Sequence, residues 1–162
     1  MLSEFQIHTL SPVYNRNSHI LILGTFPSVK SRESSFYYGH PQNRFWRVLA
    51  GLFQEETPKN NSEKTEFLLS HNIALWDVIK SCEITGSADS TIKSVVPNNI
   101  NIILDNCPIK AVYANGKTAE KLYNQYLQEI TGRKIIALPS TSPANASYTL
   151  EKLQDSWKII LK

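Results

Sequence analysis

The sequence predicts an α/β fold in three layers, an α/β/α sandwich around a central, mainly parallel four-stranded sheet. Two observations support this class. Four short apolar segments alternate along the chain with segments whose apolar residues recur at helical spacing. Each apolar segment also ends in a loop of Gly, Pro, Asn, Ser and Thr, so several polar loops should meet at one edge of the sheet. With 162 residues, we expect one domain covering residues 1–162.

The first predicted strand and helix enclose the most informative stretch of the chain. Residues 1–17 are expected to be a lead-in that packs against the sheet. Ile20–Leu23 has the length and composition of a buried parallel strand, which stops at Gly24, and Pro27 follows. After a polar and aromatic loop, residues 45–53 are apolar at helical spacing. This order places the loop at the carboxyl edge of the sheet, where ligands bind in open α/β folds.

The middle of the chain contains a second predicted strand. A helix is expected to begin at residues 61–63, and residues 73–76 form an apolar strand that ends in Asp77. The segment Cys82–Ser90, rich in Ser, Thr and Gly, is expected to be a loop. Thr91–Val96 is expected to be a helical stretch.

Three further helices and two strands complete the prediction. Asn98 or Asn99 is expected to cap a helix that runs through Leu104. Residues 109–114 and 135–138 are the remaining strands, separated by a helix over residues 118–130. Residues 148–161 form an amphipathic helix.

Composition limits the possible partners and compartments. A formal net charge of +3 permits a polyanionic partner without requiring one. Cys82 and Cys107 are far apart and in no metal-binding spacing, so we expect buried free thiols in a reducing compartment. The sequence shows no signal peptide and no membrane-spanning run. We therefore expect a cytoplasmic monomer.

Two motifs resemble those of the uracil-DNA glycosylase superfamily. GTFPS at 24–28, followed by YGHPQNRFW at 38–46, resembles its first motif, most closely that of the deoxyinosine (hypoxanthine) DNA glycosylase branch. LPSTSPA at 138–144 resembles the second motif, and CEITGSAD at 82–89 resembles a loop of the same branch. This implies a DNA glycosylase of base excision repair that needs no metal or cofactor and hydrolyses the glycosidic bond of a deaminated base, hypoxanthine above all. A mismatch-specific uracil glycosylase and a non-catalytic DNA-binding relative are the alternatives.

The resemblance assigns catalysis to two asparagines. Asn43 would orient the attacking water through its amide oxygen, although the same residue could simply cap the helix that follows. Asn115 would read the amide edge of the base with a donor and an acceptor, although Asn-Gly is also a turn signal.

Further residues are expected to contact the base or the DNA. Phe26 replaces the acid or amide that orients water in the most active relatives, and Ser140 replaces their histidine. Tyr38 would stack on the extruded base, and Asp89 would help to order the site. The base-binding set is Gly24, Thr25, Phe26, Tyr38 and Ser140, and the DNA-binding set is Pro27, Ser28, Lys30, Arg32, Thr141, Ser142 and Ala144.

Overall fold

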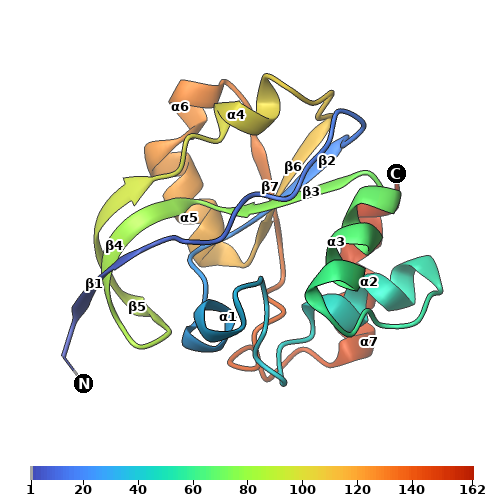
Figure 1. The fold of residues 1–162 in the computed structure, drawn as a ribbon, viewed down its shortest axis with the longest axis horizontal. Helices are drawn as coiled ribbons and strands as arrows, with labels where there is room; N and C mark the ends of the chain where they lie inside the picture. Colours follow the sequence, from blue (N-terminus) through green and yellow to red (C-terminus); the bar gives the residue numbers. More distant parts are fainter. Residues whose placement is uncertain (1) are drawn as a thin grey trace.

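A wholly parallel sheet of four strands forms the centre of the computed structural model, which describes residues 2–162 (Figure 1). Its strand order is β3-β2-β6-β7. The strands are β2 (Ile20–Gly24), β3 (Ile73–Asp77), β6 (Ala111–Asn115) and β7 (Ile135–Leu138). All four predicted strands are confirmed. The prediction could be made because strands of a parallel sheet are covered on both faces and are therefore almost continuously apolar.

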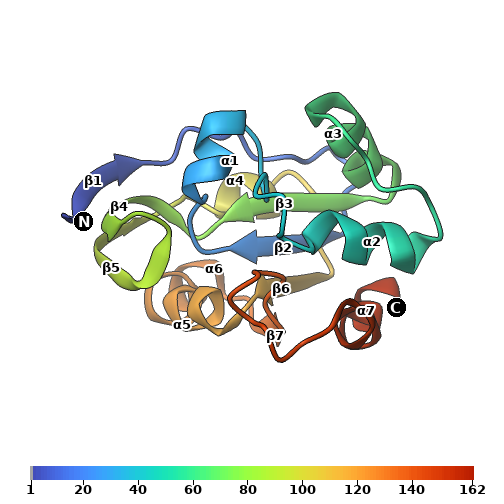
Figure 2. The ribbon, with the colours of Figure 1, turned by 90° about the horizontal axis from the view of Figure 1, so that it is seen from below.

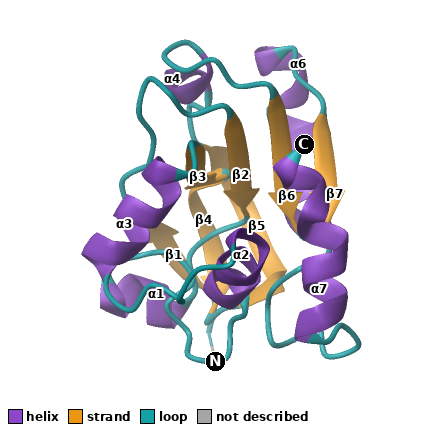
Figure 3. Cartoon of the chain, turned by 90° about the vertical axis from the view of Figure 1, so that its right-hand side faces the viewer, coloured by secondary structure: helices purple, strands orange, loops and turns teal. Residues whose placement is uncertain are grey.

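Helices cover both faces of this sheet, which confirms the three-layer class. Figures 1 and 2 show α5 and α6 on one side and α2, α3 and α7 on the other. In Figure 3, α2 and α7 lie side by side in front of the parallel strands. The helix bounds are α1 Val29–Ser34, α2 Phe45–Phe53, α3 Asn61–Ser70, α4 Asn101–Leu104, α5 Lys117–Tyr126, α6 Gln128–Thr131 and α7 Leu150–Trp157, followed by the 3₁₀ helix η1 Lys158–Leu161.

Several helix boundaries differ from the sequence expectation. The start of α3, at Asn61, is as expected, and the cap residue before it is Asn60, whose side chain accepts a hydrogen bond from the Glu63 N–H. The helix expected over residues 118–130 is two helices, α5 and α6, and α4 has no side-chain cap because Ile100 holds the cap position. The loop after β2 also contains the short helix α1, capped by Ser28, which the sequence analysis did not predict.

A second, antiparallel sheet corrects the expectation for the middle of the chain. It has the order β1-β4-β5, with β1 at Glu4–Ile7, β4 at Ile79–Thr85 and β5 at Ala88–Pro97. The loop expected at Cys82–Ser90 and the helix expected at Thr91–Val96 are therefore wrong. Thr85 pairs with Ala88, so Gly86 and Ser87 form a two-residue hairpin turn, and Gly86 has a φ of 60°.

The lead-in packs against the protein as expected. Within it, β1 pairs with β4, and Val13 forms an isolated bridge with Leu75 of β3. Met1 lies outside the described residues. Cys82 and Cys107 are both buried and free, as predicted.

Candidate functional site

A cavity of about 530 Å³ lies at the carboxyl edge of the parallel sheet. The last residues of β2, β3 and β6 line it, together with the loop after β7, as the parallel topology requires. It brings together every residue assigned from the sequence to the base or the DNA, except Lys30 and Arg32. The hairpin turn and the start of β5 also contribute to its wall, through Ser87, Ala88, Asp89 and Ser90.

Three side chains from different parts of the chain form one hydrogen-bonded network. Asn115 Nδ2 donates to Thr141 Oγ1 over 3.0 Å, and the Thr141 hydroxyl donates to Asn43 Oδ1 over 2.9 Å. The main-chain N–H of Thr141 also donates to Asn115 Oδ1 over 3.0 Å. Thr141 is fully buried. Its side chain therefore offers no surface to DNA and instead fixes the orientation of both amides.

Asn43 lies one residue before the cap position of α2, which Arg44 holds without a side-chain cap hydrogen bond, so the cap interpretation of Asn43 is wrong. Asn43 Oδ1 accepts a hydrogen bond from the Phe45 N–H at the start of α2, over 2.9 Å, in addition to the one from Thr141. Both acceptor positions of this oxygen are thus occupied. The amide nitrogen has no hydrogen-bond partner among residues 2–162. A contact of Asn43 with a ligand in the cavity would come from this donor rather than from the oxygen.

The network gives a stability prediction. Thr141→Val keeps the side-chain shape but leaves a buried amide N–H of Asn115 without its acceptor, and we expect a loss of about 1–3 kcal/mol in the free energy of unfolding. Urea denaturation measures this loss. Thr141→Ser keeps the hydroxyl and removes one buried methyl group, which costs about 0.5–1.5 kcal/mol. If the valine variant is as stable as the wild type, the hydroxyl contributes nothing to the network.

Tyr38 forms part of the cavity wall in an unusual backbone conformation. Its φ is 53°, and its ring stacks on Phe45 with centroids 4.1 Å apart and planes 23° apart. Its hydroxyl oxygen is buried and has no partner among the described residues. Burial, with the charge of Asp77 as a smaller cause, raises the pKa of this hydroxyl far above its ordinary value, so it stays protonated.

Gly24 leaves the space that the neighbouring polar atoms fill. A Cβ atom at this position would lie 2.4 Å from Asp77 Oδ1 and 2.6 Å from the Tyr38 hydroxyl oxygen. Both oxygens therefore lie directly over Gly24, and only glycine allows this approach.

Phe26 and Ser140 give the cavity neutral surfaces. Phe26 is 9% exposed, and the Arg32 guanidinium lies over its ring, 5.6 Å from the centroid. Ser140 Oγ accepts a hydrogen bond from the Ser142 N–H over 3.1 Å. The Ser142 hydroxyl in turn accepts one from the exposed Ala144 N–H, so these two serines stabilise their own loop.

Two arginines in the first motif region serve the fold. Arg44 donates to the main-chain carbonyls of Ser142 and Asn145 over 2.9 and 3.1 Å and also to that of Tyr148, so it holds the loop after β7. Arg32 donates to the carbonyls of Pro27 and Gly86 and joins α1 to the hairpin turn.

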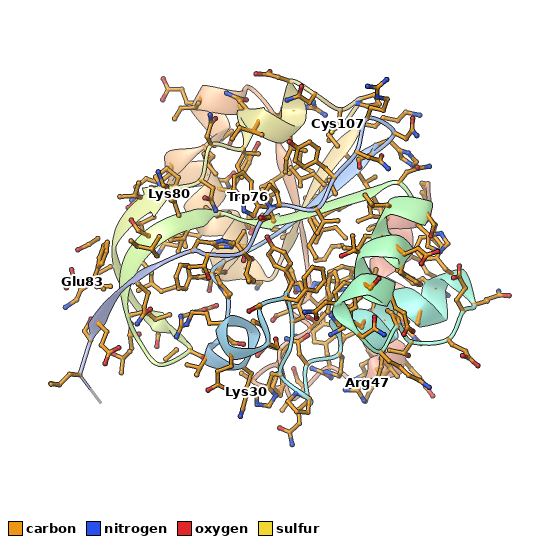
Figure 4. All side chains as sticks on the ribbon, in the orientation of Figure 1. Lys30, Arg47, Trp76, Lys80, Glu83 and Cys107 are labelled. Carbon is orange, nitrogen blue, oxygen red and sulfur yellow. The ribbon has the colours of Figure 1, made fainter. Side chains whose placement is uncertain are left out.

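Two exposed cations lie on the helices α1 and α2. Lys30 is largely exposed and lies 3.6 Å from Glu33. Figure 4 shows Lys30 on α1 and Arg47 on α2 at the same lower edge of the molecule. Arg47 is exposed and was not singled out from the sequence. Its position on the polar face of an otherwise apolar helix is the signal that could have identified it.

Two carboxyl groups line the cavity, one from β3, which was predicted from the sequence, and one from β5, which was not. Asp77 is buried at the end of β3, whereas Asp89 is exposed near the start of β5. Although Asp89 is exposed as a whole residue, it lines the cavity, and the loss of water around its carboxyl, with the charge of Asp77 as the smaller cause, raises the pKa of that carboxyl to about 6. No group of three or more His, Cys, Asp or Glu side chains in residues 2–162 could hold a metal ion. Within the same residues, no helix is long and apolar enough to cross a membrane.

Comparison with known proteins gives consistent results over nearly the whole chain. The family model described as Uracil DNA glycosylase superfamily matches residues 11–161. The chain is 36% identical over 148 residues to a hypoxanthine DNA glycosylase from Methanosarcina barkeri, with 90% of this chain and 92% of the relative covered. It is 33% identical over 152 residues to a hypoxanthine DNA glycosylase from Methanosarcina acetivorans, with 93% and 94% covered. The solution NMR structure of a candidate uracil DNA glycosylase from Methanosarcina acetivorans is similar with a TM-score of 0.80 and 28% identity, and the match covers 98% of this chain and 100% of that chain.

Proposed function

The chain belongs to the uracil DNA glycosylase superfamily, and from this premise we propose that it hydrolyses the glycosidic bond of deoxyinosine in DNA and releases hypoxanthine. The observation that carries this proposal is the similarity, over at least 90% of the chain, to two proteins named hypoxanthine DNA glycosylase. The neutral Phe26 and Ser140 support it, because both stand where efficient uracil enzymes are expected to have polar catalytic groups.

The donors in the cavity suit a departing purine base. Negative charge develops on the base as the glycosidic bond breaks, and preorganised N–H groups stabilise that charge. Asn43 Nδ2 is free to donate, and Asn115 Nδ2 uses only one of its two hydrogens in the bond to Thr141. Asn43 thus acts on the base rather than holding the attacking water through its oxygen. The open face of Tyr38 would stack on the base, since Phe45 covers the other face.

DNA contacts would surround the mouth of this cavity. Lys30 and Arg47 supply phosphate contacts from α1 and α2, with Ser142 and the exposed Ala144 on the opposite loop. We assign Arg32 a supporting role, because its guanidinium already binds two carbonyls. We further propose that the protein acts as a monomer in the cytoplasm, where its two buried free thiols suit the reducing conditions.

Base release from matched duplexes tests the proposed function. Duplexes that contain a single inosine, uracil or adenine are incubated with the protein, and abasic sites are scored after alkaline cleavage. We expect the fastest release from inosine and none from adenine. Faster release from uracil would replace the proposal by a mismatch uracil glycosylase, and binding without release of any base would replace it by a non-catalytic DNA-binding protein.

The carboxyl of Asp89 makes DNA binding dependent on pH. Since its pKa is raised to about 6, the group is neutral below this pH and negatively charged above it. We expect the Kd for DNA to rise, by up to about fivefold, as the pH increases through 6, because the carboxylate repels phosphates at an exposed position. Fluorescence anisotropy between pH 5 and 7.5 measures this change. Asp89→Asn should bind DNA more tightly at pH 7.5 and lose the step; an unchanged step would assign it to another group.

A further inference from the structure

Two loops meet at the mouth of the cavity. The turn before α2 (residues 40–43) and the loop after β7 (residues 140–144) both contribute to the cavity wall. The main-chain N–H of Arg44 donates to the Thr141 carbonyl over 3.1 Å and so joins the two loops. Both lie at the lower edge of the molecule in Figure 1, the edge at which Figure 4 shows the two cations proposed to contact phosphates. A duplex bound across the cavity would therefore run over both loops.

The turn before α2 is held in one shape and carries a free side chain at its tip. The Asn43 N–H donates to the His40 carbonyl over 2.9 Å, and the Gln42 N–H donates to His40 Nδ1 over 3.1 Å. Pro41 restricts the backbone further, because its ring fixes φ. Gln42 is exposed, and its side chain makes no hydrogen bond with any residue in 2–162. The fold thus presents a free amide, on an ordered turn, beside the cavity.

The loop after β7 presents only short side chains at the mouth. Its exposed residues in the cavity wall are Pro143 and Ala144. When a base leaves the stack, the duplex loses stacking and pairing at that position, and an inserted side chain can offset part of this cost. Alanine is too short to fill the vacated space, and neither residue has a polar side-chain atom for the base that has lost its partner. The loop after β7 is therefore poorly suited to replace the extruded base.

We propose that Gln42 enters the duplex in place of the extruded base and hydrogen-bonds to the base on the opposite strand. Its amide offers an acceptor oxygen beside a donor NH₂ group. This pair complements the Watson–Crick edge of thymine, the partner of a deaminated adenine, and also that of cytosine when the amide is turned over. The inference rests on the proposed function and deepens it, because it names the group that keeps the duplex open during base release.

Gln42→Ala tests this role on three substrates. They are an inosine·thymine duplex, the same duplex with an abasic residue in place of the thymine, and the single strand that contains inosine. We expect single-turnover release of hypoxanthine from the inosine·thymine duplex to fall by about five- to a hundredfold, because the thymine is left without a partner. The loss should be much smaller opposite the abasic residue and absent on the single strand. Equal losses on all three substrates, or no loss on any, would overturn the proposal.

A fluorescent base beside the inosine measures strand opening without base release. 2-Aminopurine is quenched within the stack and becomes brighter when its neighbour is extruded. Asn43→Ala, which is expected to slow release, provides a background in which this signal lasts. Adding Gln42→Ala to that background should reduce the increase in fluorescence on the inosine·thymine duplex. An increase of the same size with and without Gln42→Ala would overturn the role in strand opening.

Gln125→Ala is the matched control, because Gln125 is exposed on α5 and lies outside the cavity wall. It should leave release and fluorescence unchanged. Gln42→Ala should unfold at the wild-type temperature, since its side chain has no hydrogen bond to lose, so a slower rate would not reflect misfolding.

The outcomes separate this inference from the proposed function. Wild-type release of uracil but not of hypoxanthine would overturn the proposed substrate, and the same three substrates built with uracil would then decide on Gln42. If the wild type releases neither base, the fluorescence decides alone. An increase that depends on Gln42 would then retain its role in opening the duplex while the proposed activity fails, and an increase that does not depend on it would overturn both.

Discussion

Replacing Asn43 with Ala is expected to slow single-turnover release of hypoxanthine by about a hundred- to a thousandfold, the usual effect of removing one preorganised donor. DNA affinity should change little, because Asn43 Nδ2 is assigned to the departing base and not to a phosphate. Rapid-quench measurements at saturating enzyme give the rate, and anisotropy gives the affinity. The variant also loses the two hydrogen bonds that Asn43 Oδ1 accepts, from the Phe45 N–H and the Thr141 hydroxyl, so about 1–3 kcal/mol of stability should be lost as well.

Asn43→Asp is the control that separates these hydrogen bonds from catalysis. An aspartate keeps an oxygen to accept from the Phe45 N–H and the Thr141 hydroxyl, as Asn43 Oδ1 does. It replaces the amide NH₂ by a second oxygen, so it cannot donate to the base. We expect a folded and nearly inactive protein. An Asp variant as active as the wild type would show instead that residue 43 orients the water through an oxygen.

Gly24→Ala should also have a large effect, although it adds a single methyl group. The new Cβ would lie 2.4 Å from Asp77 Oδ1 and 2.6 Å from the Tyr38 hydroxyl oxygen, so both residues must move. Overpacking of this kind costs roughly 1–3 kcal/mol. Misplacement of the base-contacting groups by about 1 Å can lower the release rate by about a hundredfold.

Gly51→Ala is the matched control for this substitution. Its Cβ would meet the terminal amide of Gln154, which lies at the end of a flexible side chain and can turn away. Release and stability, measured by the same single-turnover assay and by thermal unfolding, should stay close to wild type or improve slightly, because Ala favours a helix over Gly. Wild-type activity of Gly24→Ala would show that Asp77 and Tyr38 can shift without affecting the site.

The parallel sheet could be predicted from sequence because each of its strands is an apolar run between polar loops. The hairpin of β4 and β5 could not, because its strands carry many polar residues and its pairing contains register shifts. In such strands polar and apolar residues do not alternate regularly. Thr91–Val96, with its β-branched residues, forms a strand because it pairs with β4. That choice depends on tertiary contacts and not on local pattern.

The candidate site could be predicted where a motif identified it. Asp77 ends a buried strand just as Asn115 does, so the rule that ligands bind at the carboxyl ends of parallel strands could also have identified it. His8, whose Nε2 atom lies 2.8 Å from Asp77 Oδ2, could not be linked to the site from sequence, because the pairing of β1 with β4 brings it there. The role of Thr141 as a link between two amides was equally hidden, since the three residues of the network lie 26 and 98 positions apart.

The link from Asn43 through Thr141 to Asn115 also bears on how the protein acquires activity during synthesis. Thr141 follows Asn43 by 98 positions in the chain, and β7, which precedes Thr141, joins the sheet beside β6. A nascent chain can assemble β2 and β3 early, but neither asparagine is oriented until the loop after β7 has left the ribosome. Long-range contacts of this kind slow folding. A chain without the loop after β7 therefore lacks the hydrogen bonds that orient both asparagines.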